Sequence, residues 1–314
     1  MPSYNRAHLI SEALDSVFAQ TFSDYEVILV DDGSTDGTED LVKKRYGGRL
    51  TYVKQENRGI SGARNRGIES SRGKYIAFLD SDDKWLPEKL ARQAAYMEAH
   101  PGVGLLATKL VRYEIGGRQE ETRQICPPDF PRGFLDLLTG KNFVPTTTTM
   151  VRRECLDTVG VFDPELKVAE DWDLWLRIAR RYEIFCLDEV LAEHRDHPQK
   201  TTQNLFKVYD GYWRFYEKML RLYGKEIPDL KGYRRRGVSF EYLLGCEYLR
   251  HSKMRPAFRH IKGAVMKDFA VGMYFQKGKG AGRKVMGFFK PYFALVVSVV
   301  GIVVSLLRLP QNRR

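Results

Sequence analysis

The sequence predicts an α/β fold in which a mostly parallel sheet carries helices on both faces. Over the first 110 residues, short apolar runs alternate with amphipathic helical stretches, and this alternation is typical of strand–helix–strand units. The chain has 314 residues, of which 43% are hydrophobic and 12% aromatic. This composition allows a sizeable core and excludes disordered and fibrous classes. The length suits one large catalytic domain with an appendage.

The expected strands and helices follow one another along the chain. Strands occupy residues 25–30, 51–54, 74–79 and 103–108, and helical patterns run over 7–20, 37–46, 60–71 and 87–100. Further along, 146–151 is β-branched and strand-like, and 170–182 is an amphipathic helix. From residue 203 onward the pattern is helical, with a break near 224–228 and room for a helical hairpin over 235–270.

Basic residues are concentrated near the C-terminus. Residues 1–230 hold 33 Lys and Arg against 37 Asp and Glu, a net charge of −4, whereas residues 231–314 hold 18 against 3, a net charge of +15. A basic segment attached to a nearly neutral globule predicts an anionic partner, either a lipid surface or a nucleic acid. The four cysteines lack C-x-x-C spacing, which excludes a thiolate zinc site.

An apolar stretch over 292–307 favours the lipid surface over the nucleic acid. As a helix it spans about 24 Å, slightly less than the ~30 Å bilayer core, and basic residues flank it. A buried core helix is the alternative. We expect residues 286–309 to associate with the membrane and the preceding basic residues to place the globular part on its cytoplasmic face. The chain then comprises a catalytic domain over 1–202, a basic helical extension over 203–285 and this terminal helix.

Acidic residues stand at the ends of two predicted strands. Asp31 and Asp32 follow the first strand, and Asp80 and Asp82 follow the third. Ligands bind outside the carboxyl ends of strands in such sheets, and clustered carboxylates need a cation or hydrogen-bond donors to offset their repulsion. The pattern predicts Mg²⁺ or Mn²⁺, because these hard ions prefer oxygen ligands and also bind phosphates. Taken singly, each cluster also fits an Asp-rich turn or a helix start.

Five sequence blocks, in their order and spacing, resemble family 2 glycosyltransferases of GT-A fold. They are PSYN at 2–5, DDGSTD at 31–36, NRGISGARN at 57–65, FLDSDD at 78–83 and AED at 169–171. The resemblance covers residues 1 to about 200 and implies a mixed GT-A sheet flanked by helices. It also implies an inverting, metal-dependent transfer of a sugar from a nucleotide-diphosphate donor, commonly a UDP-sugar. The implied acceptor is a hydroxyl of a glycan or lipid-linked molecule in cell-surface polysaccharide synthesis.

The resemblance assigns donor-side roles residue by residue. By position in the motifs, the nucleotide-sugar would be bound by Pro2, Tyr4, Asp32, Arg64 and Asp80. Asp80 and Asp82 would form the metal-binding D-x-D pair, with Asp82 as the direct ligand.

The resemblance also implies a catalytic base. Asp171 matches the residue that takes the proton of the acceptor hydroxyl, and Glu170 beside it would raise the pKa of Asp171 by like-charge proximity. One base is enough, because a metal offsets the charge on the leaving diphosphate. Arg195 and His197 match a Y-R-x-H element near the pyrophosphate, with His194 in place of the tyrosine. The alternative for the acidic pair is a first helical turn favoured by the helix dipole.

The chain departs from the family pattern at its start. Relatives carry a hydrophobic strand directly before the P-[ST]-Y-N block, whereas here Met1 precedes Pro2. Two explanations are open: a start site upstream of Met1, which we favour, or a truncated protein of low stability.

Two tryptophans, Trp172 and Trp175, lie in the helix that begins with the acidic pair. They either stack on an acceptor sugar or pack in the protein core. Aromatic residues spaced i, i+3 on a helix are more often core residues, so the core is the expected location.

Three other functions remain as alternatives. A metal-dependent nucleotidyltransferase also places acids at strand ends, but the sequence contains no G-x-x-x-x-G-K-[ST] phosphate loop. A nucleic-acid-binding module could use the basic residues over 231–284, although the apolar terminal stretch and the five blocks argue against nucleic acid as a partner. A non-catalytic glycosyltransferase relative is disfavoured because the acidic residues of the motifs are all present.

Overall fold

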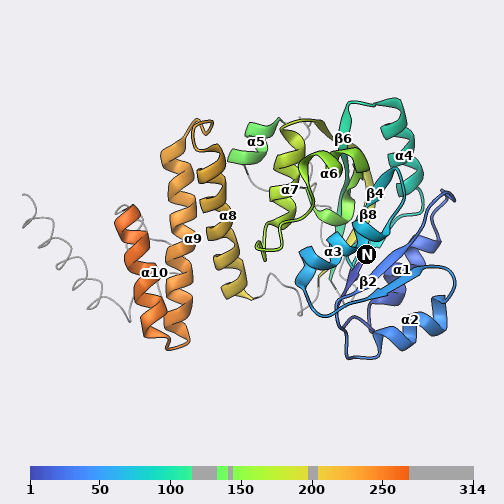
Figure 1. Cartoon of the computed structure of the whole chain (residues 1–314), viewed down its shortest axis with the longest axis horizontal. Helices are drawn as coiled ribbons and strands as arrows, with labels where there is room; N and C mark the ends of the chain where they lie inside the picture. The colour runs from blue at the N-terminus through green and yellow to red at the C-terminus, as the bar shows by residue number, and fades with distance from the viewer. Residues whose placement is uncertain (115–132, 141–143, 197–203, 269–314) are drawn as a thin grey trace, which may run out of the picture. The chain divides into compact units, whose positions relative to one another are not determined.

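The computed structural model describes residues 1–114, 133–140, 144–196 and 204–268 (Figure 1). The chain divides into two compact units, Met1–Arg234 and Arg235–Arg314. The divisions expected at residues 202 and 285 stay predictions, and the expected membrane helix over 286–309 lies outside the described residues. Among the helices that are described, none is both long and apolar enough to cross a membrane.

A three-stranded parallel sheet forms one part of the first unit. Its order is β1 (Pro2–Ser3), β2 (Ile28–Asp31) and β3 (Thr51–Lys54), with Pro2 opposite Val30. All four residues of β2 are buried, as its continuous apolar run requires. Helix α3 (Gly59–Ser70) packs on β1 and β2. The other two helices of this region are α1 (Ile10–Phe18) and α2 (Thr38–Tyr46).

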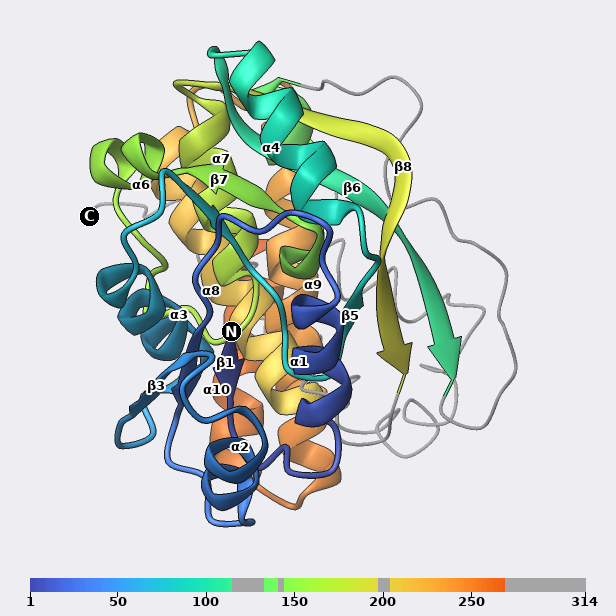
Figure 2. The same cartoon turned by 90° about the vertical axis from the view of Figure 1, so that its right-hand side faces the viewer.

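A five-stranded mixed sheet completes the first unit, in the order β4-β7-β6-β8-β5. Its strands are β4 (Tyr75–Ala77), β5 (Lys84–Trp85), β6 (Val103–Glu114), β7 (Met150–Arg152) and β8 (Glu183–Asp196). The long strands β6 and β8 run parallel, side by side, in Figure 2, whereas the β4–β7, β6–β7 and β5–β8 pairs are antiparallel. The mixed sheet expected from the resemblance is confirmed. The parallel pairing expected from strand–helix alternation is present in β1-β2-β3 and between β6 and β8, whereas the short strands β4, β5 and β7 pair antiparallel.

Helices lie on both sides of this mixed sheet. In Figure 1, α4 (Lys89–Ala99) lies on one side of β6 and α7 (Glu170–Ala179) on the other. The shorter helices are α5 (Phe134–Thr139) and α6 (Arg153–Val159). The strand expected over 146–151 is instead a 3₁₀ turn, η1 (Thr146–Thr148), followed by β7. The hydroxyls of Thr148 and Thr149 donate to nearby carbonyls at 2.8 and 2.7 Å, and such local bonds favour a turn over a strand.

Three helices follow within the described residues 204–268. They are α8 (Leu205–Tyr223), α9 (Leu230–Arg250) and α10 (Met254–Lys267). The break near 224–228 and the hairpin within 235–270 are both present.

Lys89 lies in the core of the first unit with its side chain fully buried. Its Nζ donates to Gln93 Oε1 at 2.5 Å and lies 4.4 Å from the centre of the Trp85 ring. Gln93 donates to the carbonyls of Leu106 and Thr148, at 2.8 and 3.0 Å, and so links α4 to β6 and η1. Because burial disfavours the ammonium form, the pKa of Lys89 falls to about 7.

The free energy of unfolding should therefore rise with pH above neutrality. Below pH 7 Lys89 is mostly protonated in the folded state and its burial cost is present. As pH rises toward the ordinary value of 10.5, the folded protein loses this proton while the unfolded chain keeps it, which relieves the cost. We expect the Lys89 contribution to increase by about 2 kcal/mol between pH 7 and 9, and Lys89→Met to abolish that increase. Urea unfolding at both pH values measures it, and an unchanged pH slope in the variant would contradict the assignment.

Candidate active site

The Asp31-Asp32 pair lies where β2 ends, and Asp31 supports the turn that follows. Asp31 is fully buried. Its Oδ1 accepts from the Ser34 backbone N–H at 2.8 Å, and its Oδ2 accepts from the Tyr52 hydroxyl on β3. Gly33 has a φ of +85°, a backbone conformation that glycine adopts without strain. Asp31 therefore has a structural role in fixing the β2 turn.

Asp32, the predicted nucleotide-binding acid, organises the loop between β3 and α3. The residue is 4% exposed. Its Oδ1 accepts from Gln55 Nε2 at 2.7 Å and from the Arg58 N–H at 2.8 Å, and its Oδ2 accepts from the Gly59 N–H at 2.8 Å. These three neutral donors compensate the buried charge. A nucleotide would therefore meet an Asp32 already bonded to the start of α3, and its predicted role stays a prediction.

The PSYN block lies beside the turn after β2. Pro2 is buried in β1, whereas Tyr4 is 48% exposed. Asn5 has a φ of +52° and is held on both sides: its N–H donates to Ser34 Oγ at 2.9 Å, and its Oδ1 accepts from the Thr35 N–H at 2.8 Å. The fold thus brings two of the five sequence blocks together and leaves the Tyr4 ring accessible to a ligand.

Arg64 joins three of the five blocks. Its guanidinium on α3 is 2% exposed and donates to Glu170 Oε1 at 2.7 Å and to Asp80 Oδ1 at 2.8 Å. The guanidinium carbon also lies 5.2 Å from the centre of the Phe162 ring. Burial opposes the charge of Arg64, but the carboxylates of Asp80 and Glu170 outweigh it and raise the pKa of Arg64. The predicted donor-binding arginine is therefore a fixed cation at the centre of an acidic cluster.

Asp171, the predicted base, lies in the first turn of α7. Its Oδ1 accepts from the Trp172 N–H at 2.7 Å, and its Oδ2 accepts from Thr146 Oγ1 at 3.2 Å. Burial, followed by the charge of Glu170, raises the pKa of Asp171 to about 7, against smaller opposing effects of Arg64 and these hydrogen bonds. A carboxyl group with this pKa changes protonation near neutral pH, as a general base does.

Arg195 and His194 belong to strand β8, which was not among the strands expected from the sequence. Arg195 is 7% exposed; its Nε donates to the Asp82 carbonyl at 2.5 Å, and its Nη1 pairs with Glu12 at 2.9 Å. His194 Nδ1 lies 3.0 Å from Asp83 Oδ1. No strand signal is present in the sequence here because pairing with β5 and β6, rather than an apolar run, makes this charged segment a strand. His197 lies outside the described residues.

The D-x-D carboxylates fit a divalent cation by their chemistry. Asp82 Oδ2 lies 3.8 Å from Arg6 Nη2, a long ion pair in which about a fifth of each side chain is exposed. Burial raises the pKa of Asp83, His194 opposes the rise, and the charges of Asp82 and Asp80 add to it. The described residues contain no group of three or more Asp, Glu, His or Cys side chains arranged around one ion. Mg²⁺ is commonly held by one or two carboxylates together with water and phosphate, which is what this pair offers.

Trp172 and Trp175 are core residues, as expected from their spacing. They are 2% and 0% exposed. The Trp172 indole donates to the Leu137 carbonyl at 2.9 Å and stacks on Phe215 of α8 at 4.4 Å, and the Trp175 indole donates to the Val144 carbonyl at 3.1 Å. Neither ring is available to an acceptor sugar in this structure.

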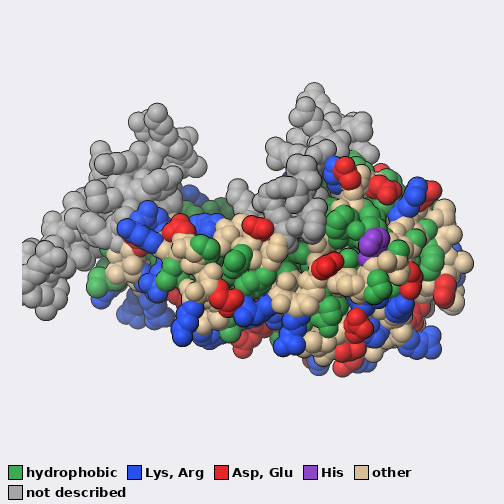
Figure 3. Space-filling view, turned by 90° about the horizontal axis from the view of Figure 1, so that it is seen from above, with side chains coloured by type: hydrophobic (Ala, Val, Ile, Leu, Met, Phe, Trp, Pro, Cys, Tyr) green, Lys and Arg blue, Asp and Glu red, His purple; other side chains and the backbone are tan. Residues whose placement is uncertain are grey.

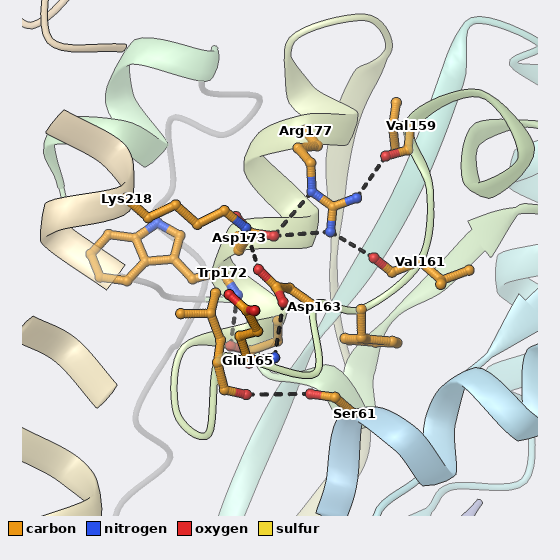
Figure 4. Close-up of polar contacts among 12 residues, drawn as sticks. Ser61, Val159, Val161, Asp163, Glu165, Trp172, Asp173, Arg177 and Lys218 are labelled. Carbon is orange, nitrogen blue, oxygen red and sulfur yellow. Dashed lines mark hydrogen bonds and ion pairs between the residues drawn. The ribbon is translucent and has the colours of Figure 1, made fainter. Parts of the chain in front are cut away.

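A charged cluster fixes α7 from its buried side, as Figure 4 shows. Asp173 is fully buried between Arg177 Nη2 at 2.9 Å and Lys218 Nζ at 2.6 Å. Lys218, on α8, also pairs with Asp163 at 2.8 Å, and Arg177 donates to the Val159 carbonyl at 2.7 Å. The cluster ties α7 to α8 and to the segment after α6. Sequence reasoning missed it, and missed Thr146, because the partners are far apart in the chain.

A surface cavity of about 700 Å³ opens next to the end of β3 and α3. Lys54, Gln55, Arg58, Asn65 and Arg66 are among its lining residues, and none of Asp80, Asp82 and Asp171 is. It therefore adjoins the Asp32 loop without containing the acidic cluster.

The model of the family described as glycosyl transferase family 2 matches residues 1–160. The chain belongs to glycosyltransferase family 2. It is 30% identical over 231 residues to the putative teichuronic acid biosynthesis glycosyltransferase TuaG of Bacillus subtilis (strain 168), covering 71% of this chain and 87% of that protein.

Similarity to two solved structures shows that this chain has the expected GT-A fold. S. aureus TarS in complex with UDP-GlcNAc aligns with a TM-score of 0.57 at 20% identity, covering 84% of this chain and 90% of that chain. The mannosyltransferase PcManGT of Pyrobaculum calidifontis, in complex with GDP-Man and Mn²⁺, aligns with a TM-score of 0.55 at 19% identity, covering 100% and 86%.

Replacing Arg64 should lower the free energy of unfolding more than replacing an exposed arginine does. Arg64→Met leaves Asp80 and Glu170 without their shared cation, and we expect a loss of about 3 kcal/mol in the free energy of unfolding. Arg64→Lys keeps the charge but not the two-sided contact, so it should lose less. Denaturant unfolding of both variants, with exposed Arg72→Met as the control, measures this. Equal stability of Arg64→Met and the unchanged protein would contradict the central role of Arg64.

Proposed function

We propose that the protein is an inverting glycosyltransferase that moves a sugar from a nucleotide-diphosphate sugar to a hydroxyl group of a glycan or lipid-linked acceptor. The observation that carries the proposal is the position of Asp171 beside the Arg64 cluster, with a pKa raised to about 7. The transfer needs a base for the acceptor hydroxyl and positive charge near the leaving diphosphate. Asp171 supplies the base, and Arg64, which pairs with Asp80 of the D-x-D motif, supplies positive charge.

The acceptor side of the reaction rests on Asp171. Its carboxylate takes the proton of the acceptor hydroxyl while the hydroxyl oxygen attacks the anomeric carbon. The bond from that carbon to the diphosphate oxygen breaks in the same step, and both of its electrons leave with the diphosphate. A single displacement of this kind inverts the anomeric configuration. Glu170 contributes by disfavouring the charged form of Asp171, which strengthens it as a base.

The donor side rests on the acids after β4 and the basic residues around them. Asp82 and Asp80 would hold Mg²⁺ or Mn²⁺, which offsets the negative charge of the leaving diphosphate. Arg195, fixed by the Asp82 carbonyl and Glu12, and His197 are the residues proposed to lie near the pyrophosphate. Pro2, Tyr4 and Asp32 are proposed to bind the nucleotide.

The substrates and location are proposed from relatives and composition. The name of TuaG refers to teichuronic acid biosynthesis, and TarS was solved with UDP-GlcNAc; these support a UDP-sugar donor and a cell-surface polysaccharide product. We propose that the enzyme works at the cytoplasmic face of the cell membrane, with 286–309 as its membrane-associated helix. Membership of the family argues against the nucleotidyltransferase alternative.

The pH dependence of transfer should report Asp171. Because the pKa of Asp171 is raised to about 7, kcat/KM should increase with pH through this value as the base deprotonates. Asp171→Asn should lower kcat at least 100-fold. Glu170→Gln should move the acidic limb of the profile to lower pH, because it removes the neighbouring charge, whereas Glu165→Gln at an exposed position should leave it in place. A limb that stays put in Glu170→Gln would contradict the assignment.

Removing divalent metal should abolish turnover. We would follow release of nucleotide diphosphate from a panel of UDP- and GDP-sugars with Mg²⁺ or Mn²⁺. We expect release from one donor to stop with EDTA, return when the metal is restored in excess, and fall at least 100-fold in Asp82→Asn. Undiminished release in EDTA, or by Asp82→Asn, would refute the proposed metal site. If no donor releases nucleotide diphosphate and no nucleotide binds, the protein would instead be a non-catalytic relative of the glycosyltransferases.

A further inference from the structure

Helix α10 has a buried face and a contrasting outward face. The buried face carries Ala257, Ala264 and Val265, which are at most 4% exposed, and Ala264 packs with Val238 and Tyr242 of α9. On the outward face, two large apolar side chains are open to solvent: Phe258 at 59% and Met266 at 66%. Exposed side chains of this size mark a contact surface when they share a face with a particular chemistry.

That chemistry is positive charge. Arg255, Arg259 and Lys262 are exposed and are spaced i, i+4, i+7, so they lie on one side of the helix. Met266 continues the same row one turn further on, and Phe258 lies directly beside it. We call these five residues the α10 outward face. In Figure 3, Lys and Arg side chains lie among hydrophobic ones on the helical unit.

Nearby acids do not neutralise the three cations. Residues 235–268 contain three acidic side chains, and each is bound by another basic residue. Lys267 pairs with Glu241 at 3.0 Å, Arg250 with Glu247 at 2.7 Å, and Arg235 with Asp268 at 3.0 Å. Among the ion pairs of the described residues, none includes Arg255, Arg259 or Lys262.

We propose that the α10 outward face binds an anionic lipid surface, with Phe258 and Met266 in the headgroup–acyl boundary and the three cations on the phosphates. A helix with apolar and basic side chains on one exposed face has the composition of an interfacial helix. A second copy of the chain would place like charges against one another, and a nucleic acid would leave the two apolar side chains without a partner. The inference deepens the proposed membrane association and is independent of 286–309 and of sugar transfer.

The test compares full-length proteins in vesicle co-sedimentation at fixed salt. The triple variant Arg255→Gln, Arg259→Gln and Lys262→Gln should bind phosphatidylcholine vesicles containing phosphatidylglycerol about 100-fold more weakly, because each of the three cations near such a surface contributes about fivefold. Its binding to pure phosphatidylcholine vesicles should not change. The control, Lys44→Gln with Arg72→Gln and Arg181→Gln, removes three exposed charges from the first unit and should change anionic-vesicle binding less than threefold.

Insertion is tested separately with Phe258→Trp. Its added indole fluorescence should be quenched by brominated anionic lipid, whereas that of Leu222→Trp, at an exposed position on α8, should not. The proposal fails if the triple variant binds anionic vesicles as tightly as the control does, or if the added indole is not quenched. It also fails if the triple variant loses duplex DNA binding or self-association but keeps its binding to anionic vesicles. If the unchanged protein ignores neutral vesicles, the terminal-helix proposal fails while the anionic comparison still tests α10. Loss of sugar transfer in any assay leaves the lipid measurements unaffected.

Discussion

The architecture of the active site depends on the buried guanidinium of Arg64. Arg64 extends from α3; the segment after β4 and the start of α7 each bring a carboxylate to it, and Asp80 and Glu170 pair with this one cation at 2.8 and 2.7 Å. With Asp171 next to Glu170, a site without this cation would place three carboxylates together in a poorly solvated region, at a cost of several kcal/mol for an unpaired ion. Arg64 therefore allows an acidic site to exist where the strands end.

Arg64 does not neutralise all three carboxylates, because it forms no ion pair with Asp171. Its two ion pairs are with Asp80 and Glu170, so Asp171 feels Arg64 only as a smaller opposing effect, and burial with the neighbouring Glu170 raises its pKa to about 7. Asp32 is 4% exposed and accepts three hydrogen bonds from neutral donors. The two carboxylates thus differ in use: Asp32 is bonded to the backbone and side chains of the β3–α3 loop, whereas the raised pKa of Asp171 suits a base.

The sequence predicted those parts of the fold that local patterns encode. The strand over 51–54 is present at the expected residues, and the motif acids lie at strand ends. Strand β8 was missed because its C-terminal half, EVLAEHRD, is charged, and pairing with β5 and β6 makes it a strand. The Asp173–Lys218 contact was missed for a related reason: a pairing between distant helices leaves no periodic signal in either. Tertiary contacts, rather than propensity, decide these parts.

Burial of charge also distinguishes the two units. In the first, the functional charges lie at or near the interior, where low exposure strengthens each ion pair and shifts the pKa of Asp171. In the second, Glu241, Glu247 and Asp268 each pair with at least one basic residue, and Arg255, Arg259 and Lys262 on α10 are exposed to solvent. An exposed cation gains little from a single side-chain partner because water screens the pair. An exposed cation gains more free energy near a surface that presents many phosphates at once. The contacts of several cations then add, because binding to one surface orders the protein only once. The net charge of +15 over 231–314 is accordingly better explained by an extended anionic partner than by stabilisation of the helices that carry it.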